Sequence, residues 1–165
     1  MMSDERRRYI VDEVVARLQR RAQSTLILSG APLREAVDTE ALFCRHATLH
    51  FLRVDLSLLT RIAHADATDP VVAFIQDALA YGLRVKLSVA RRLLPALPLC
   101  RLARLPLALR DEQGEIIHLH SGKLLGYADV AHLPGGVLLL PRRCVVTPLA
   151  RETAARRHLQ LIKQE

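Results

Sequence analysis

The stretch from 115 to 130, EIIHLHSGKLLGYADV, holds the densest group of side chains that could do chemistry. His118 and His120 stand two residues apart, and in a strand this spacing places both imidazoles on one face, where they could chelate one metal ion. A zinc site needs further ligands, and the neighbouring sequence offers no H-x-x-x-H, no C-x-x-C and no paired carboxylate. We therefore interpret both histidines as residues of a half-exposed strand face and predict no metal site.

Three segments that contain glycine carry parts of phosphate-binding patterns. Ser121-Gly122-Lys123 matches the end of a phosphate loop, but Ile117 stands where the first glycine of that loop is needed. Gly135-Gly136 follows a proline and precedes an apolar run, which predicts a tight hairpin turn. The LSGAP segment at Ser29 could bind a phosphate through its backbone, but it lacks the G-x-G-x-x-G spacing of a dinucleotide fold.

No group of residues has the arrangement of a nucleophilic centre. The sequence contains no G-x-S-x-G elbow, and Cys44 stands too close to His46 along the chain to form a persuasive nucleophile and base. Cys44, Cys100 and Cys144 are an odd number, are far apart and lie among apolar residues, so we expect reduced thiols in the core. The sequence therefore predicts no catalytic residue and no cofactor.

Composition limits the classes of partner. The 165 residues fit one domain, and the net charge of +7 is spread over short arginine pairs and one triplet. With three Tyr, three Phe and no Trp, the stacking surfaces that single-stranded nucleic acid needs are scarce, so we expect no nucleic-acid partner. No apolar run approaches the roughly 20 residues that cross a bilayer, and the first residues lack the apolar core of a secretory signal. We expect a cytoplasmic protein with no membrane partner.

The first element that the sequence predicts is an amphipathic helix from Ser3 to about Arg21. Asp4 and Glu5 stand at its start and Arg20 and Arg21 at its end, as the helix dipole favours. Apolar residues recur along one face at helical spacing. They are Ile10, Val11, Val14, Val15 and Leu18. We expect residues 1–22 to form this helix and residues 23–165 to form a single α/β domain.

Short strands and helices alternate along the rest of the chain. Strands are predicted at 25–28, 48–56 and 83–89, and Asp69-Pro70 begins a helix that ends at Gly82. A strand, a helix, a glycine and a strand in succession indicate a crossover between parallel strands. Both faces of 48–56 are mostly apolar, so this strand should be internal.

The second half has a more irregular pattern. Proline interrupts leucine-rich turns, DEQGE predicts a hairpin-like turn, and IIHLH and GVLLLP predict short strands around a small helix at 127–131. Thr147 and Pro148 begin a last helix, followed by a strand at 159–162. The fold class is therefore α/β, with a mixed, partly parallel sheet flanked by helices.

Four segments together resemble the PduM family of bacterial microcompartment proteins, and the resemblance covers nearly the whole chain. They are IVDEVVARLQRRAQSTLILS, LPLCRLARLPLAL, LLGYADVAHL and CVVTPLARETAARRHLQLIKQE. The resemblance implies a non-enzymatic structural role in the assembly and stability of a propanediol-utilisation microcompartment, with shell proteins and enclosed enzymes as partners.

Two hypotheses follow for how such a protein acts. In the first, the apolar stripe of the N-terminal helix docks into a groove on a shell or core partner, and the body supplies a second contact surface. Packing of this helix on its own domain, or pairing with a second copy, is the alternative, and the oligomeric state stays open. In the second hypothesis, an accessory domain binds a small molecule or cofactor at the carboxyl ends of its parallel strands.

Overall fold

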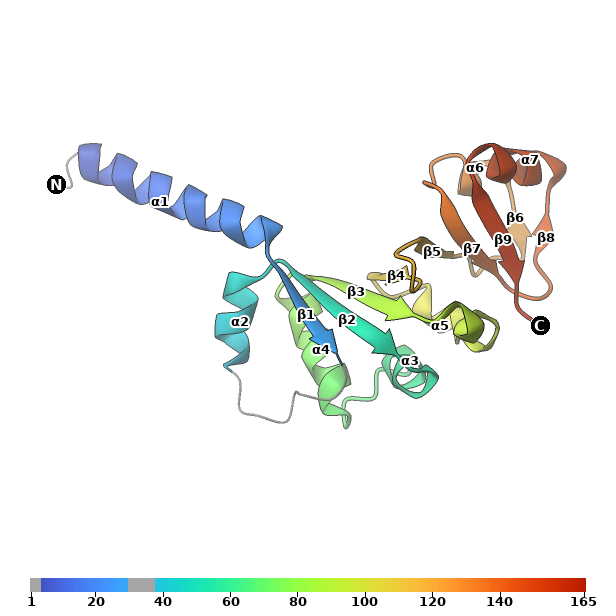
Figure 1. Ribbon diagram of the computed structural model, residues 1–165, viewed down its shortest axis with the longest axis horizontal. Helices are drawn as coiled ribbons and strands as arrows, with labels where there is room; N and C mark the ends of the chain where they lie inside the picture. The colour runs from blue at the N-terminus through green and yellow to red at the C-terminus, as the bar shows by residue number, and fades with distance from the viewer. Residues whose placement is uncertain (1–3, 30–37) are drawn as a thin grey trace.

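The computed structural model describes residues 4–29 and 38–165 (Figure 1). Seven α-helices, one 3-10 helix and nine strands are assigned within these ranges. In chain order they are α1 (Asp4–Gln23), β1 (Thr25–Ser29), α2 (Thr39–Arg45), β2 (Thr48–Val54), α3 (Leu56–Ala63), α4 (Pro70–Ala80), β3 (Arg84–Val89), the 3-10 helix η1 (Arg91–Ala96), α5 (Leu99–Leu102), β4 (Leu107–Arg110), β5 (Ile116–Leu119), β6 (Leu124–Leu125), α6 (Tyr127–Val130), β7 (Gly136–Leu140), β8 (Val145–Val146), α7 (Pro148–Arg156) and β9 (Leu159–Lys163).

Seven of the strands form one sheet in the order β1-β2-β3-β4-β5-β7-β9. The first four strands are parallel to one another, β4 and β5 are antiparallel, and β7 and β9 continue parallel to β5. The sheet therefore consists of two parallel halves that run in opposite directions and meet at the β4–β5 turn. The predicted class, a mixed and partly parallel α/β sheet with an N-terminal helix, is confirmed.

The two halves of the sheet are covered on opposite faces. Side chains alternate between faces along a strand. In β7, Val137 and Leu139 pack into the core formed with α3 and α4, whereas Leu138 and Leu140 pack into a second core with α7. The other face of β2 and β3, away from the first core, is not covered by α7. Half-buried polar residues such as His50 and Ser88 lie on that face.

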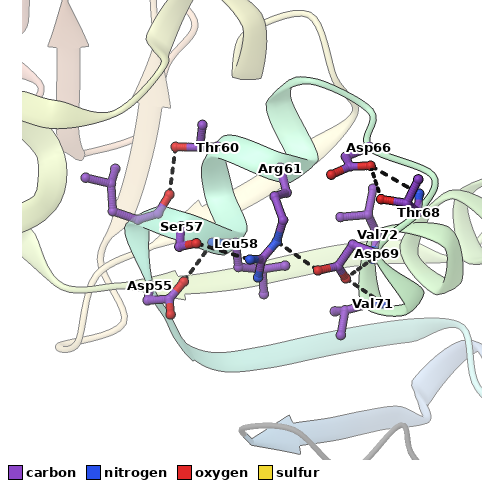
Figure 2. A network of polar contacts seen from close by, with 11 residues as sticks. Asp55, Ser57, Leu58, Thr60, Arg61, Asp66, Thr68, Asp69, Val71 and Val72 are labelled. Carbon is purple, nitrogen blue, oxygen red and sulfur yellow. Dashed lines mark hydrogen bonds and ion pairs between the residues drawn. The ribbon is translucent and has the colours of Figure 1, made fainter.

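Aspartate residues begin the two helices between β2 and β3, as Figure 2 shows. The Asp55 Oδ1 atom accepts a hydrogen bond from the backbone N–H of Leu58 at 2.7 Å. Asp69 caps α4 by accepting from two backbone N–H groups, and its other oxygen lies 2.8 Å from the Arg61 Nε atom. Asp69 therefore both caps α4 and links it to α3 through an ion pair.

Several predicted elements are confirmed with small changes of boundary. The N-terminal helix ends at Gln23, β2 lies between β1 and β3 as an internal strand, and β2 and β3 are parallel across α4. Gly82 follows α4 with a φ of +78°, a left-handed conformation that favours glycine at a helix end. The helices α2 and α3 and the strand β4 were not predicted, because each is short and combines an arginine with its apolar residues.

Two predictions are wrong. Gly135-Gly136 does not form a hairpin, since β7 is parallel to both of its neighbours and this pair connects α6 to β7. The prediction of core cysteines holds for Cys144 alone, because Cys44 and Cys100 are exposed, although all three thiols are free. Within the described part of the chain, no helix is both long enough and apolar enough to cross a lipid bilayer.

Candidate interaction surfaces

The helix α1 carries an apolar stripe that the described residues leave uncovered. Its five apolar side chains are 43% to 57% exposed, and α1 contains no buried residue. These stripe residues are Ile10, Val11, Val14, Val15 and Leu18. Figure 1 shows why, since α1 extends away from the sheet and from the other helices. A helix with an uncovered apolar stripe is suited to docking into a groove on another protein.

The end of α1 is attached to the body by polar contacts. Arg21 lies in the last turn of α1, shortly before β1 begins, and its Nε atom donates to the backbone carbonyl of Phe43 at 3.2 Å. Ser24 Oγ lies 2.6 Å from the Nδ1 atom of His46. Outside the stripe, Glu13 pairs with Arg17 at 2.9 Å. The helix is therefore anchored at one end while its stripe remains accessible.

A second exposed apolar patch lies on the C-terminal part of the fold. Leu124 and Val145 are register partners in the small β6–β8 sheet, and they are 57% and 61% exposed. Tyr127 and Leu149, in the first turns of α6 and α7, are 52% and 53% exposed, and these two helices contact each other. We call these four residues the C-terminal patch. Sequence reasoning missed it, because its members come from two separate segments of the chain and each resembles a core residue.

A cleft of about 410 Å³ beside β5 is lined by His118, His120 and Asp129, among other residues. The Nε2 atom of His118 lies 3.2 Å from the carbonyl oxygen of Pro134, and that of His120 lies 3.0 Å from the carbonyl oxygen of Leu124. Burial lowers the pKa of His118, so its neutral form is favoured. Asp129 accepts from the Gly126 N–H at 2.8 Å. His118, His120 and Asp129 thus all contact backbone atoms of nearby segments, as structural side chains do.

The remaining candidate residues are not brought together. Among residues 4–29 and 38–165, no three His, Cys, Asp or Glu side chains are grouped closely enough to hold a metal ion. His46 contacts Ser24, not the neighbouring Cys44. The LSGAP segment ends in residues 30–32, which lie outside the described residues.

The comparisons with known proteins decide the family. The family described as “Putative propanediol utilisation” matches residues 9–160. The chain is 54% identical over 164 residues to the bacterial microcompartment assembly protein PduM of Citrobacter freundii, covering 99% of this chain and all of that protein. The chain belongs to the PduM family. Another member, the bacterial microcompartment assembly protein PduM of Salmonella typhimurium strain LT2, is 50% identical over 164 residues, with 99% of this chain and all of the relative covered.

No solved structure matches this PduM-family chain.

Proposed function

We propose that this chain is a non-enzymatic component needed for the assembly and stability of a 1,2-propanediol-degrading bacterial microcompartment, where it resides. Both relatives are named as microcompartment assembly proteins, and they align with 99% of this chain. The observation that carries the proposal is the uncovered stripe of α1. An assembly factor acts by touching other proteins, so it needs apolar surface that its own core does not bury.

In this proposal the α1 stripe binds a shell protein. A helix contributes its i, i+3, i+4 and i+7 side chains to a groove, and Val11, Val14, Val15 and Leu18 have that spacing. Removing such side chains from water drives binding at roughly 25 cal/mol per Å² of apolar area. The polar anchors at Arg21 and Ser24 would limit the orientations in which α1 is presented, which lowers the entropy lost on binding.

The C-terminal patch is proposed as the second contact surface, toward an enclosed enzyme. In Figure 1, α6, α7 and β8 lie at the opposite end of the fold from the free end of α1. Two surfaces that are separated in this way can be occupied at the same time. Residues 23–165 would then act as a single α/β domain, which is supported by the one sheet that runs from β1 to β9.

The test of the first contact is co-purification of the full chain, and of the chain lacking residues 1–22, with individual shell proteins of the propanediol compartment. The full chain is expected to capture a shell protein, and the shortened chain is expected to lose it. Circular dichroism should confirm that the shortened chain stays folded, since α1 contributes no residue to either core. Equal capture by both chains would refute a role for α1, and self-association through α1 would appear as a change in mass by light scattering.

The C-terminal patch gives a separate prediction. Leu124→Asp combined with Val145→Asp places two charges on neighbouring strands of the exposed β6–β8 sheet. We expect this variant to retain shell-protein capture and to lose enclosed-enzyme capture at least about tenfold, since each position would be a desolvated contact. Both captures are measured by pull-down. Unchanged enzyme capture, with the melting temperature of the variant preserved, would remove the patch from the account.

A further inference from the structure

An open cleft of about 720 Å³ lies at the carboxyl ends of β2, β3 and β4. It is lined by the last residues of these strands and by the segments that follow them, including Asp55, Ala90 and the turn at 111–114. Open α/β sheets bind ligands at this edge, and the volume lies within the range of small-molecule sites. The cleft is distinct from both the α1 stripe and the C-terminal patch.

Three arginine residues bring positive charge to the cleft wall. They come from three different segments: Arg53 from the end of β2, Arg92 from η1 and Arg110 from the end of β4. Among the described residues, the side chains of Arg53 and Arg92 form neither a hydrogen bond nor an ion pair. Arg110 donates through Nη1 to the carbonyl of Gly114 at 2.6 Å. Two whole guanidinium groups and part of a third are therefore available to a ligand.

The carboxylates of the same cleft are already engaged. Asp55 accepts from the Leu58 N–H as the cap of α3. Asp111 is 1% exposed, accepts from two backbone N–H groups of its own turn, and lies 3.2 Å from the Nε atom of Arg91. Glu112 accepts from the Arg91 backbone N–H at 2.8 Å. Each of these carboxylates thus has a fixed hydrogen-bond partner in the cleft wall, whereas the guanidinium groups of Arg53 and Arg92 have none.

The backbone at Arg53 is distorted where its side chain joins the cleft. Arg53 has a φ of +54°, which is costly for a residue other than glycine, and the β2–β3 register shifts between Phe51 and Val54. A bulge of this kind changes the direction of a side chain at the end of a strand. Such strain is found most often at functional sites, where the surrounding structure maintains it.

Polar side chains from β2 and β3 also line the cleft. His50 lies 2.8 Å from Ser88, with its Nε2 atom facing the Ser88 Oγ atom across β2 and β3. Burial lowers the pKa of His50, and the charges of Lys86 and Arg110 lower it further. A neutral imidazole and a hydroxyl group can both donate to an anion or accept from a ligand hydroxyl.

We infer that this cleft binds a small organic phosphate, with the phosphate between the guanidinium groups of Arg53, Arg92 and Arg110 and the organic part against Leu52 and Leu93. Guanidinium groups match the oxygens of phosphate in bidentate geometry, and a dianion suits three of them better than a single carboxylate does. The leucine residues line the same cleft and give a ligand that has an apolar portion an advantage over a free phosphate ion.

The test is isothermal titration of the full chain with phenyl phosphate, inorganic phosphate, benzoate and phenol. Phenyl phosphate is expected to bind tightest, inorganic phosphate more weakly, and phenol and benzoate weakest. Arg53→Gln combined with Arg92→Gln should weaken phenyl phosphate binding at least about tenfold, because two charge-assisted contacts are lost. Arg142→Gln combined with Arg143→Gln removes the same charge from exposed residues after β7 and should leave binding unchanged.

Three results would overturn the inference. They are no heat with phenyl phosphate, equal affinity for phenyl phosphate and benzoate, and equal loss in the two arginine double variants. The last result would indicate attraction to net charge alone. None of these results bears on shell-protein capture by α1, so the two proposals can fail separately.

Discussion

Replacing Val14 and Leu18 of α1 by aspartate is expected to reduce shell-protein affinity at least about 100-fold, since hot-spot side chains at the centre of an interface each contribute about 2 kcal/mol or more. Both side chains are about half exposed and touch neither core of the body. The variant should therefore remain folded while losing its apolar anchors. Affinity is measured by biolayer interferometry on immobilised shell protein, and recruitment by fluorescence of the tagged chain in cells that make compartments.

The matched control carries the same two added charges on α1 at positions outside the stripe. Ala16→Asp combined with Gln19→Asp changes positions that fall outside the stripe on a helix of 3.6 residues per turn. The affinity of this control for the shell protein should stay within about threefold of that of the unmodified chain, a difference of under about 1 kcal/mol. Equal losses in the two double variants would mean that general charge or helix stability, and not the stripe, determines binding.

Gly136→Ala is expected to destabilise the fold by at least about 3 kcal/mol, through backbone strain and a steric clash together. A Cβ atom at this position would lie 2.3 Å from the carbonyl oxygen of Ile116, and the φ of Gly136 is +132°. Ile116 begins β5, so the clash would push β7 away from its neighbour in the middle of the second half of the sheet. Chemical denaturation followed by circular dichroism measures the loss.

Gly82→Ala separates the two causes. Gly82 also has a positive φ, of +78°, but nothing lies within 4 Å of the Cβ atom that alanine would add. This variant should lose only about 1 kcal/mol, the cost of a left-handed conformation for one residue. If Gly136→Ala is no worse than Gly82→Ala, then the close approach of β5 and β7 is not what requires glycine.

The parts of the fold that sequence reasoning predicted are those whose signals are local. The α1 stripe follows from helical periodicity, and the parallel β2–β3 pair follows from an Asp-Pro start and a Gly end around α4. The hairpin at Gly135-Gly136 was wrong because a glycine pair indicates only that the chain approaches something closely. It does not indicate whether that neighbour is the next strand or, as here, β5.

Among the candidate surfaces, too, only the one formed by a single local element could be predicted from the sequence. The five stripe residues could be named from the sequence because they belong to one helix. Their exposure could not, since it depends on α1 leaving the body. The C-terminal patch joins Leu124 to Val145 only through the β6–β8 pairing, and the cleft brings Arg53, Arg92 and Arg110 together only through the order of β2, β3 and β4. These residues become neighbours only through the strand order, which the sequence pattern does not reveal.

Site-specific photo-crosslinking from α1, in cells that assemble the compartment, tests directly whether the stripe contacts a shell protein. A photoreactive amino acid at position 14 lies in the stripe, and one at position 19 lies outside it. A covalent adduct between position 14 and a shell protein is expected, with little or none from position 19. Equal adducts from both positions, or adducts from position 14 only with a second copy of this chain, would contradict that expectation.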